Sequence, residues 1–258
     1  MGNDIITQRK NWDRLSNLDP YWAILVDSEK INMKWEVNEF YSTGKKQIYK
    51  LFGLLNKLGI NVRFNRALDY GCGVGRLSEA LADYFEDVIA VDFSQNMLNL
   101  AKTRRQCANL TYQKVNGQDI SNFPSKTFDF VVSLITLQHS PSKVQYNLLK
   151  EMVRVIKDDG VIAVTLVTHM GLGNFLRNVS NNISPKITNL FLQLRQRVIG
   201  KKIGHYDIGI ASQMFPVSKR KVLTTMKQLG LECKYLNTSE ISGTEDSSLE
   251  IFIIYRGS

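Results

Sequence analysis

The sequence contains little cysteine and little proline. Its 258 residues include three cysteines and five prolines. Cys72, Cys107 and Cys233 are scattered without paired spacing, which argues against both a disulfide framework and a zinc site. We therefore expect no metal cofactor. This cysteine usage fits a reducing compartment, the cytoplasm.

Long hydrophobic runs are also absent. No stretch of about 18 uninterrupted apolar residues is present to span a bilayer. Residues 1–10 lack the apolar core of a signal peptide. The sequence therefore predicts a soluble, cytoplasmic protein. Its length is enough for one α/β domain with an appendage and a sizeable core.

Positive charge is concentrated in one segment. The chain has 33 Lys or Arg and 24 Asp or Glu, a net charge of +9. Residues 171–230 hold ten of the cations and a single acid, Asp207, so they account for the whole excess. One interpretation is an ordinary solvated face. The other is a surface for an anionic acceptor, a phosphate-bearing carrier or an acidic membrane.

A glycine-rich loop follows a short apolar strand near residue 70. Residues 69–75 read Asp-Tyr-Gly-Cys-Gly-Val-Gly, and a second apolar run ends at Asp92, seventeen residues after Gly75. Closely spaced glycines allow a tight turn and let a ligand touch bare backbone. An acid at the end of the second strand can accept both hydroxyls of a ribose. Dinucleotide folds require G-x-G-x-x-G, but residue 76 is Arg. The pattern predicts a different nucleotide-like ligand over the first turn of an α/β sheet.

Three ordered motifs resemble those of the class I methyltransferases that use S-adenosylmethionine (SAM). They are residues 69–75, Asp92-Phe-Ser-Gln-Asn-Met97 and Phe128-Asp-Phe-Val-Val-Ser133, and the resemblance covers roughly residues 66–167. Residues 19–44 are similar to the lead-in of a bacterial small-molecule subgroup. The resemblance implies methyl transfer from SAM, which leaves S-adenosylhomocysteine (SAH), to an oxygen or nitrogen atom of a small-molecule or carrier-borne acceptor. A non-catalytic SAM-binding module and an RNA-directed methyltransferase are the alternatives.

The resemblance also assigns cofactor contacts. The backbone of the glycine loop would hold the methionine end of SAM, one acid would orient that loop and attract the ammonium group, and a second acid would bind the ribose. Other residues would pack against the ribose and adenine, read the adenine, or lie where the cofactor meets the acceptor. The loop residues are Gly71, Cys72 and Gly73, the first acid is Asp69 and the second acid is Asp92. Phe93 and Met97 would pack against the ribose and adenine. Asn116 and Gly117, with Asp119 as the rival, would read the adenine, and Leu134 would lie where the cofactor meets the acceptor.

The acceptor side is predicted to follow the strand that ends near Leu134. His139 can act as a general base, because imidazole titrates near neutrality; alternatively it hydrogen-bonds a loop carbonyl. Gln138 is a candidate acceptor contact. The Asn/Asp-Pro-Pro-Tyr-like sequence of enzymes that methylate adenine or glutamine nitrogens is absent. DNA is therefore not expected as a partner.

The basic segment contains further candidates for acceptor binding. Arg195 and Arg197 lie beside an amphipathic helical pattern, and His205 and Tyr206 follow it. In the family that these motifs resemble, an insertion after the fifth strand commonly forms a lid over the acceptor. One His next to one Asp is poor metal-ligand spacing, so surface or packing roles are the other interpretation of residues 205–207.

Together these patterns predict a seven-stranded, doubly wound α/β sheet with an antiparallel last strand. Strands are expected near 67–70, 88–92, 110–115, 128–134, 161–167, 231–235 and 249–255. Four regions follow from this reading: an N-terminal helical cap at 1–60, a SAM-binding Rossmann-like core at 61–168, a basic helical lid at 169–212, and the final helix and two strands of the core at 213–258.

Overall fold

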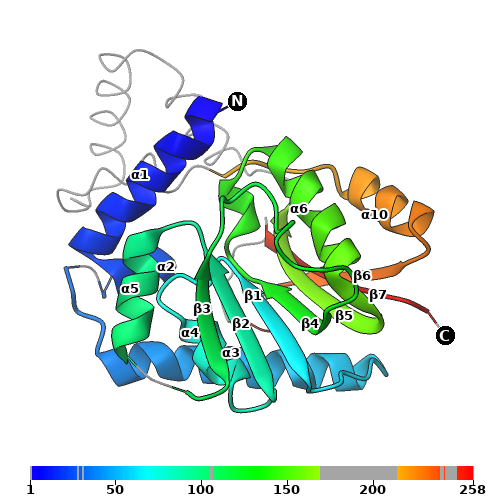
Figure 1. Ribbon diagram of the computed structural model, residues 1–258, viewed down its shortest axis with the longest axis horizontal. Coiled ribbons are helices and arrows are strands. Elements are labelled where there is room, and N and C mark those ends of the chain that lie inside the picture. The colour runs from blue at the N-terminus through cyan, green and yellow to red at the C-terminus, as the bar shows by residue number, and fades with distance from the viewer. Residues whose placement is uncertain are drawn as a thin grey trace.

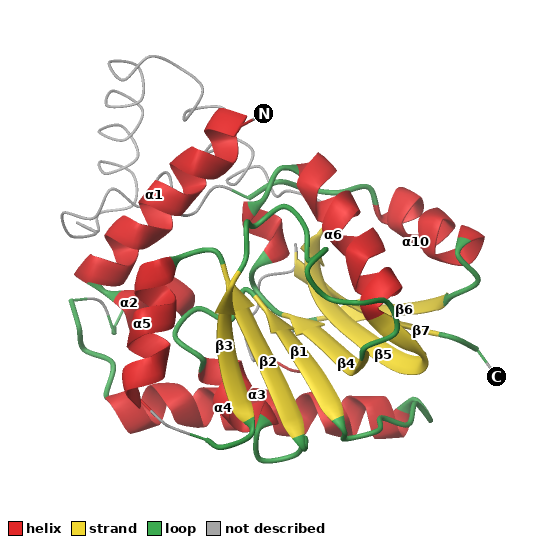
Figure 2. Ribbon diagram, in the orientation of Figure 1, coloured by secondary structure: helices red, strands yellow, loops and turns green. Residues whose placement is uncertain are grey.

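A computed structural model describes residues 2–27, 29–30, 32–104, 107–168, 214–238, 241 and 249–257. It shows one sheet with helices on both faces (Figures 1 and 2). The strands are β1 (Arg66–Tyr70), β2 (Asp87–Asp92), β3 (Leu110–Lys114), β4 (Phe128–Ser133), β5 (Ile156–Val167), β6 (Glu232–Asn237) and β7 (Leu249–Tyr255). The helices are α1 (Gly2–Leu18), α2 (Pro20–Ile24), α3 (Val37–Lys57), α4 (Arg76–Leu81), α5 (Gln95–Arg104), the 3₁₀-helix η1 (Leu137–His139), α6 (Ser142–Val155) and α10 (Lys219–Gln228). The predicted lid at 169–212 lies outside the described residues.

The sheet has the strand order β3-β2-β1-β4-β5-β7-β6. Strands β1 to β5 pair in parallel, whereas β7 is antiparallel to both β5 and β6. This confirms the predicted seven-stranded sheet with an antiparallel last strand. The chain order reverses between β1 and β4, and ligands of such sheets bind at the carboxyl ends of the strands on either side of the reversal.

The core lies in two layers, one on each face of the sheet. Helices α3 and α4 cover one face of the sheet, to which β1 contributes Ala67. Helices α6 and α10 cover the other face, to which β1 contributes Leu68. Successive strand residues point to opposite faces, so a central strand covered on both sides must be apolar throughout. All six residues of β4 are buried, including its one charged residue.

Helix α3 is longer than the sequence suggests. The apolar spacing predicts a helix over 45–58, but α3 begins at Val37 because the Glu36 side chain accepts hydrogen bonds from the backbone N–H groups of Asn38 (3.0 Å) and Glu39 (2.7 Å). Gly44 lies inside the helix, where glycine is unfavourable. A Cβ at this position would collide with the backbone of Arg76. The glycine therefore allows α3 to lie directly against α4.

Strand β5 also begins earlier than predicted. The sequence Asp158-Asp-Gly160 predicts a turn before a strand at 161–167, but the structure assigns these residues to β5, which follows α6 directly. The pairing register with β4 shifts here, from Phe128 opposite Ile156 to Phe130 opposite Val161. This irregularity accommodates residues 158–160 within β5, so the strand continues through them.

Helix α1 crosses the carboxyl ends of the central strands (Figure 1). Near one end, the Gln8 side chain donates a hydrogen bond to the carbonyl of His139, at the end of η1. Farther along, Asp13 accepts a hydrogen bond of 2.5 Å from the hydroxyl of Ser94, just before α5. The first helix thus bridges the segments that follow β4 and β2. Among the described residues, none of the helices is both long and apolar enough to cross a membrane.

Candidate functional site

The glycine loop adopts a backbone that side chains disfavour. Gly71, Gly73 and Gly75 have φ angles of 75°, 54° and 85°, a region that residues with a Cβ enter at a cost. The N–H groups of Gly71 and Cys72 both donate to the carbonyl of Val91 at the end of β2, at 2.8 and 3.0 Å. A Cβ on Gly71 would collide with the Thr136 side chain. The loop therefore presents bare backbone because neither φ nor space admits a side chain there.

Asp92 is fixed at the end of β2. One carboxylate oxygen accepts from the N–H of Gly73 at 2.9 Å, and the other accepts from the N–H of Ser94 at 2.8 Å. Burial raises the pKa of Asp92 to about 6, although backbone donors, including the N–H of Phe93, oppose the shift. An ionised carboxylate offers about four acceptor positions. Acceptor capacity therefore remains for a ribose hydroxyl.

Two charged residues support the loop from below. Asp69 is buried and accepts a hydrogen bond of 2.6 Å from the Ser78 hydroxyl in α4, and burial raises its pKa to about 6. Arg76 is also buried and donates to Thr43 at 3.2 Å and to Gln47 at 2.7 Å, both on α3. Arg76 thus ties the loop to α3. Asp69 was predicted to orient the loop and attract a ligand's ammonium group; its carboxylate contacts α4 and does not line the pocket.

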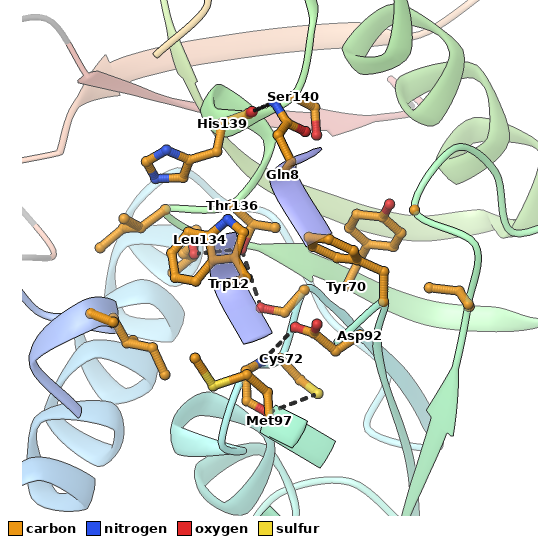
Figure 3. Close-up of a pocket in the computed structure, with 18 of the residues that line it drawn as sticks. Gln8, Trp12, Tyr70, Cys72, Asp92, Met97, Leu134, Thr136, His139 and Ser140 are labelled. Atoms are coloured by element: carbon orange, nitrogen blue, oxygen red, sulfur yellow. Dashed lines mark hydrogen bonds between the residues drawn. The ribbon is translucent and has the colours of Figure 1, made fainter. Parts of the chain in front are cut away.

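A pocket opens over this loop (Figure 3). Its walls come from the glycine loop, from the end of β2, from the segments after β3 and β4, and from α1 and α2. The predicted cofactor residues that line it are Gly71, Cys72, Gly73, Asp92, Phe93, Met97, Gly117 and Leu134. Cys72 packs against Ala90 and Leu98, and burial raises the pKa of its thiol well above the usual value. Because a buried, protonated thiol is unreactive, the side chain serves in packing and not as a nucleophile.

The roof of the pocket comes from the N-terminal segment. Gln8 and Trp12 of α1, with Ala23 and Ile24 of α2, line it. Leu134 and Thr136 line the same pocket. All three tryptophans lie in the first 35 residues, and this concentration predicts an aromatic N-terminal cap. The sequence does not indicate which of them reaches the pocket.

His139 lies at the opposite side of the pocket from Met97 (Figure 3). Its imidazole meets the Trp12 ring edge to face, with centroids 5.5 Å apart. The segment before it is strained, because Ile135 is β-branched and has a φ of 59°. The Ile135 N–H donates to the Thr165 hydroxyl at 2.6 Å, and the Thr136 hydroxyl contacts the Gly71 carbonyl at 3.2 Å. These bonds fix the segment that carries His139 against the glycine loop.

Gln138, the predicted acceptor contact, is fully buried and does not line the pocket. Its backbone carbonyl accepts from the Phe215 N–H at 2.7 Å, which joins η1 to the chain that leads into α10. Within the described residues, neither atom of its side-chain amide has a hydrogen-bond partner. The other predicted acceptor residues, Arg195, Arg197, His205 and Tyr206, lie outside the described residues.

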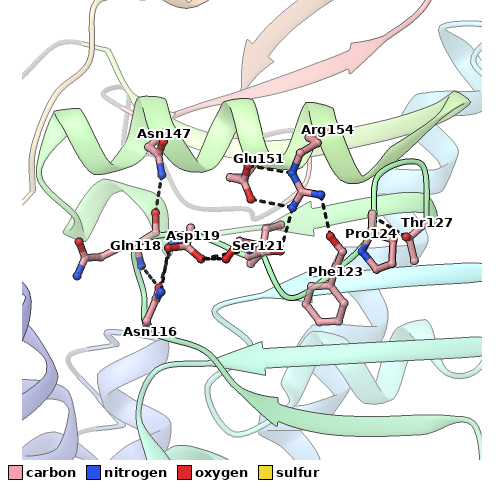
Figure 4. A network of polar contacts seen from close by, with 11 residues as sticks. Asn116, Gln118, Asp119, Ser121, Phe123, Pro124, Thr127, Asn147, Glu151 and Arg154 are labelled. Atoms are coloured by element: carbon pink, nitrogen blue, oxygen red, sulfur yellow. Dashed lines mark hydrogen bonds and ion pairs between the residues drawn. The ribbon is translucent and has the colours of Figure 1, made fainter.

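The predicted adenine loop is ordered by its own side chains (Figure 4). Asn116 accepts from the N–H groups of Gln118 (2.7 Å) and Asp119 (3.0 Å), and its amide donates to the Asp119 carboxylate at 2.9 Å. Hydrogen bonds from Ser121 and Asn116 lower the pKa of Asp119. Gly117, with a φ of 81°, is the predicted reader that lines the pocket. The other two, Asn116 and Asp119, build the loop that positions it.

Comparisons with known proteins agree with this geometry. Residues 68–164 match the family described as "Methyltransferase domain". The chain is 25% identical over 135 residues to the malonyl-[acyl-carrier protein] O-methyltransferase of Bacillus cereus, covering 51% of this chain and 48% of that protein. It is 32% identical over 103 residues to a ubiquinone biosynthesis O-methyltransferase of Coxiella burnetii, covering 39% and 43%. The chain thus spans less than half the length of these two relatives.

Solved structures share the fold. The DhpI–SAH complex matches with a TM-score of 0.60 at 14% identity, covering 100% of this chain and 98% of that one. The magnesium protoporphyrin IX methyltransferase of Synechocystis PCC 6803 with bound SAH matches with a TM-score of 0.56 at 15% identity, covering 88% and 91%. Residues 68–164 therefore form a methyltransferase domain, and the sheet order is that of the fold shared with these SAH-bound structures.

Proposed function

We propose that this protein binds SAM and transfers its methyl group to an oxygen or nitrogen atom of a small-molecule or carrier-borne acceptor. One observation carries the proposal: a single pocket contains the bare backbone of Gly71–Gly73, the buried carboxylate of Asp92, and the imidazole of His139. Both matched relatives are named as O-methyltransferases, one of them acting on a carrier protein. That likeness favours oxygen as the attacked atom.

The residues of the pocket fit SAM. The glycine loop lets the methionine end of SAM approach bare backbone, whose carbonyl oxygens can accept from its ammonium group, and Asp92 offers its remaining acceptor capacity to the ribose. Phe93, Met97 and the loop at Gly117 form the side toward which the adenine would extend. SAM supplies an electrophilic methyl group on a good leaving group.

The protein's own contribution is alignment, exclusion of water and, where the acceptor needs it, a base. Trp12 and Ile24 cover the pocket and keep solvent away. Alignment of two reactants alone can account for much of a rate enhancement. We infer that His139, which lines the same pocket, takes a proton from an acceptor hydroxyl through an imidazole nitrogen.

The primary test is titration calorimetry with SAM, SAH and NAD. We expect SAM and SAH to bind and NAD to give no measurable heat. Asp92→Asn should weaken SAM at least about tenfold, since a hydrogen bond to a charged group contributes roughly 1.5–3 kcal/mol. Asp87→Asn is the matched control, because that acid lies at the opposite end of β2 and does not line the pocket. A folded Asp92→Asn protein with unchanged affinity would falsify the ribose assignment.

The catalytic part needs a second measurement. Acceptor extracts are incubated with SAM, and products 14 mass units heavier are sought together with SAH formation. His139→Ala should lower turnover by about 10²-fold or more while SAM affinity stays nearly unchanged. Full activity in His139→Ala would mean catalysis by alignment alone. SAM binding without SAH formation for any extract would instead identify a non-catalytic module.

A further inference from the structure

Helices α6 and α10 form a continuous basic surface. They pack side by side over one hydrophobic cluster (Figure 1), and Tyr146 of α6 joins them, because its hydroxyl accepts from the Ser218 N–H at 3.0 Å. The Nζ atom of Lys221 lies 4.4 Å from the Tyr146 ring centroid. We call the exposed cations of these two helices the basic face: Lys143, Lys150, Arg220, Lys221 and Lys227.

Acidic side chains are scarce within α6 and α10. The single acid within the two helices is Glu151, and it is paired with Arg154 at 2.8 Å. Lys143 and Lys150 lie three residues before and four residues after Tyr146, so they flank it on one side of α6. Lys221 lies over the same ring, so cations of both helices border Tyr146 although the helices are separated by more than sixty residues of sequence.

This surface begins at the rim of the pocket. Ser140 lines the pocket, and its carbonyl accepts from the Gln145 side chain of α6 at 2.8 Å. The same amide donates to the Phe215 carbonyl at 2.7 Å, just ahead of α10. From this rim, the cations extend along both helices for about 10 Å, at about 1.5 Å per residue. The basic face is therefore too long for one phosphate group and is connected to the site where an acceptor would enter.

We propose that the basic face docks an acidic carrier protein that presents the acceptor to the pocket. The proposal rests on the proposed methyltransferase function and specifies the class of its partner. An extended acidic protein surface matches five cations spread over two rigid helices, and such complementarity steers association and orientation. The carrier's body would rest on α6 and α10 while the attached acceptor reaches past Ser140.

The described residues favour a protein over a membrane or a nucleic acid. Binding at a bilayer surface needs large apolar side chains beside the cations. Within α6 and α10, both of which the structure describes in full, no large hydrophobic residue is exposed, and Leu229 only follows α10. Non-specific binding of single strands needs exposed aromatic rings for stacking, whereas the Tyr146 ring has Lys221 over it.

The test is direct binding of a fluorescently labelled acyl carrier protein bearing phosphopantetheine, followed by anisotropy at about 50 mM and 300 mM salt. We expect binding that weakens with salt. Lys150→Glu with Lys227→Glu should weaken it by about tenfold or more. The matched control is Lys46→Glu with Lys50→Glu, which makes the same charge change on exposed positions of α3, across the sheet; it should change affinity by less than about twofold.

Three outcomes would overturn the inference: no binding at low salt, equal losses in the two double variants, or basic-face-dependent binding of vesicles with 30% phosphatidylglycerol or of RNA in place of the carrier. SAM calorimetry on the same samples separates this result from the broader proposal. If SAM binds and the carrier does not, the docking surface fails and the methyltransferase proposal stands. If SAM does not bind, the methyltransferase proposal itself fails.

Discussion

At the scale of single residues, we expect Asp92 to link the affinity for SAM to pH. Its pKa is raised to about 6 by burial, and under the proposed function its ionised form is the one that accepts from the ribose. The affinity for SAM should therefore be at its maximum above pH 7 and should fall as pH decreases through 6. We expect a loss of about tenfold between pH 7 and pH 5, measured by calorimetry. In Asp92→Asn this pH dependence should disappear, and a wild-type affinity that is constant over the range would contradict the assignment.

The same carboxyl groups affect stability with the opposite sign. Asp69 and Asp92 both have pKa values raised to about 6 from 3.8, so the folded protein without ligand binds more protons than the unfolded chain in this interval. Their contribution to the free energy of unfolding therefore decreases as pH rises from about 4 to 6. Asp69→Asn should flatten the dependence in urea denaturation performed from pH 4.5 to 7. A slope unchanged by Asp69→Asn would show that other groups control it.

Gly71 is required for its conformation and its lack of a side chain. Gly71→Ala places a Cβ at a φ of 75° and against the Thr136 side chain. The free energy of unfolding should decrease by about 2 kcal/mol or more, with a parallel loss of SAM affinity. Gly53→Ala is the control: Gly53 lies inside α3, where an added Cβ would meet none of the described residues within 4 Å, so the change should stabilise by up to about 1 kcal/mol. Equal effects of the two substitutions in thermal denaturation would contradict this reading.

At the scale of elements, α1 is the component that closes the pocket. Trp12 packs against His139, Gln8 contacts the His139 carbonyl, and Asp13 holds Ser94. Trp12→Ala should speed the release of SAH by about tenfold, because it removes the aromatic side chain from the roof while the ribose and methionine contacts remain. Stopped-flow displacement measures the rate. Trp12→Phe should restore most of the retention, since an aromatic ring remains.

The control for the roof is on the outer side of the same helix. Lys10 is exposed and does not line the pocket. Lys10→Ala should leave the release rate of SAH unchanged. If Trp12→Ala and Lys10→Ala behave alike, α1 contributes to folding and not to retention of the cofactor.

At the scale of the whole molecule, the two ends of the central strands have separate roles. At the amino-terminal ends, remote from the pocket, the buried Asp129 carboxylate accepts from Lys157 at 2.8 Å and from the Arg66 N–H at 3.0 Å, which joins β4, β5 and β1. Lys157→Ala should lower the free energy of unfolding by about 2 kcal/mol, less than for a fully buried pair because Lys157 is partly exposed. SAM affinity should not change.

Lys126 provides the comparison at the same end of the strands. It pairs with Asp158 at 2.7 Å, but both side chains are more than half exposed. Exposed pairs contribute about 0–1 kcal/mol, so Lys126→Ala should have little effect in urea denaturation. A change in SAM affinity on Lys157→Ala would show that the two ends of the strands are coupled.

The sequence determined the features that depend on neighbouring residues. The tight turn at Gly71–Gly75 is predictable from the backbone freedom of glycine. The position of Asp92 is predictable because it ends an apolar strand pattern. Serine just before a helical pattern predicts an N-cap, and the Ser94 hydroxyl accepts from the Met97 N–H at 3.3 Å at the start of α5. Continuous apolar runs likewise indicated a central sheet covered on both faces. Each of these needs only local propensity and the known direction of side chains from a strand.

The tertiary structure alone decided which distant segments meet. Gln8 and Trp12 reach His139 across about half of the chain, Gly44 is explained only by its contact with Arg76, and the cations of α6 and α10 form one surface only because both helices pack on the same face. Residue patterns specify which face of an element is buried, but not which other element covers it. That choice is made by packing between residues far apart in sequence, and it is what places a roof over the pocket and a basic surface at its rim.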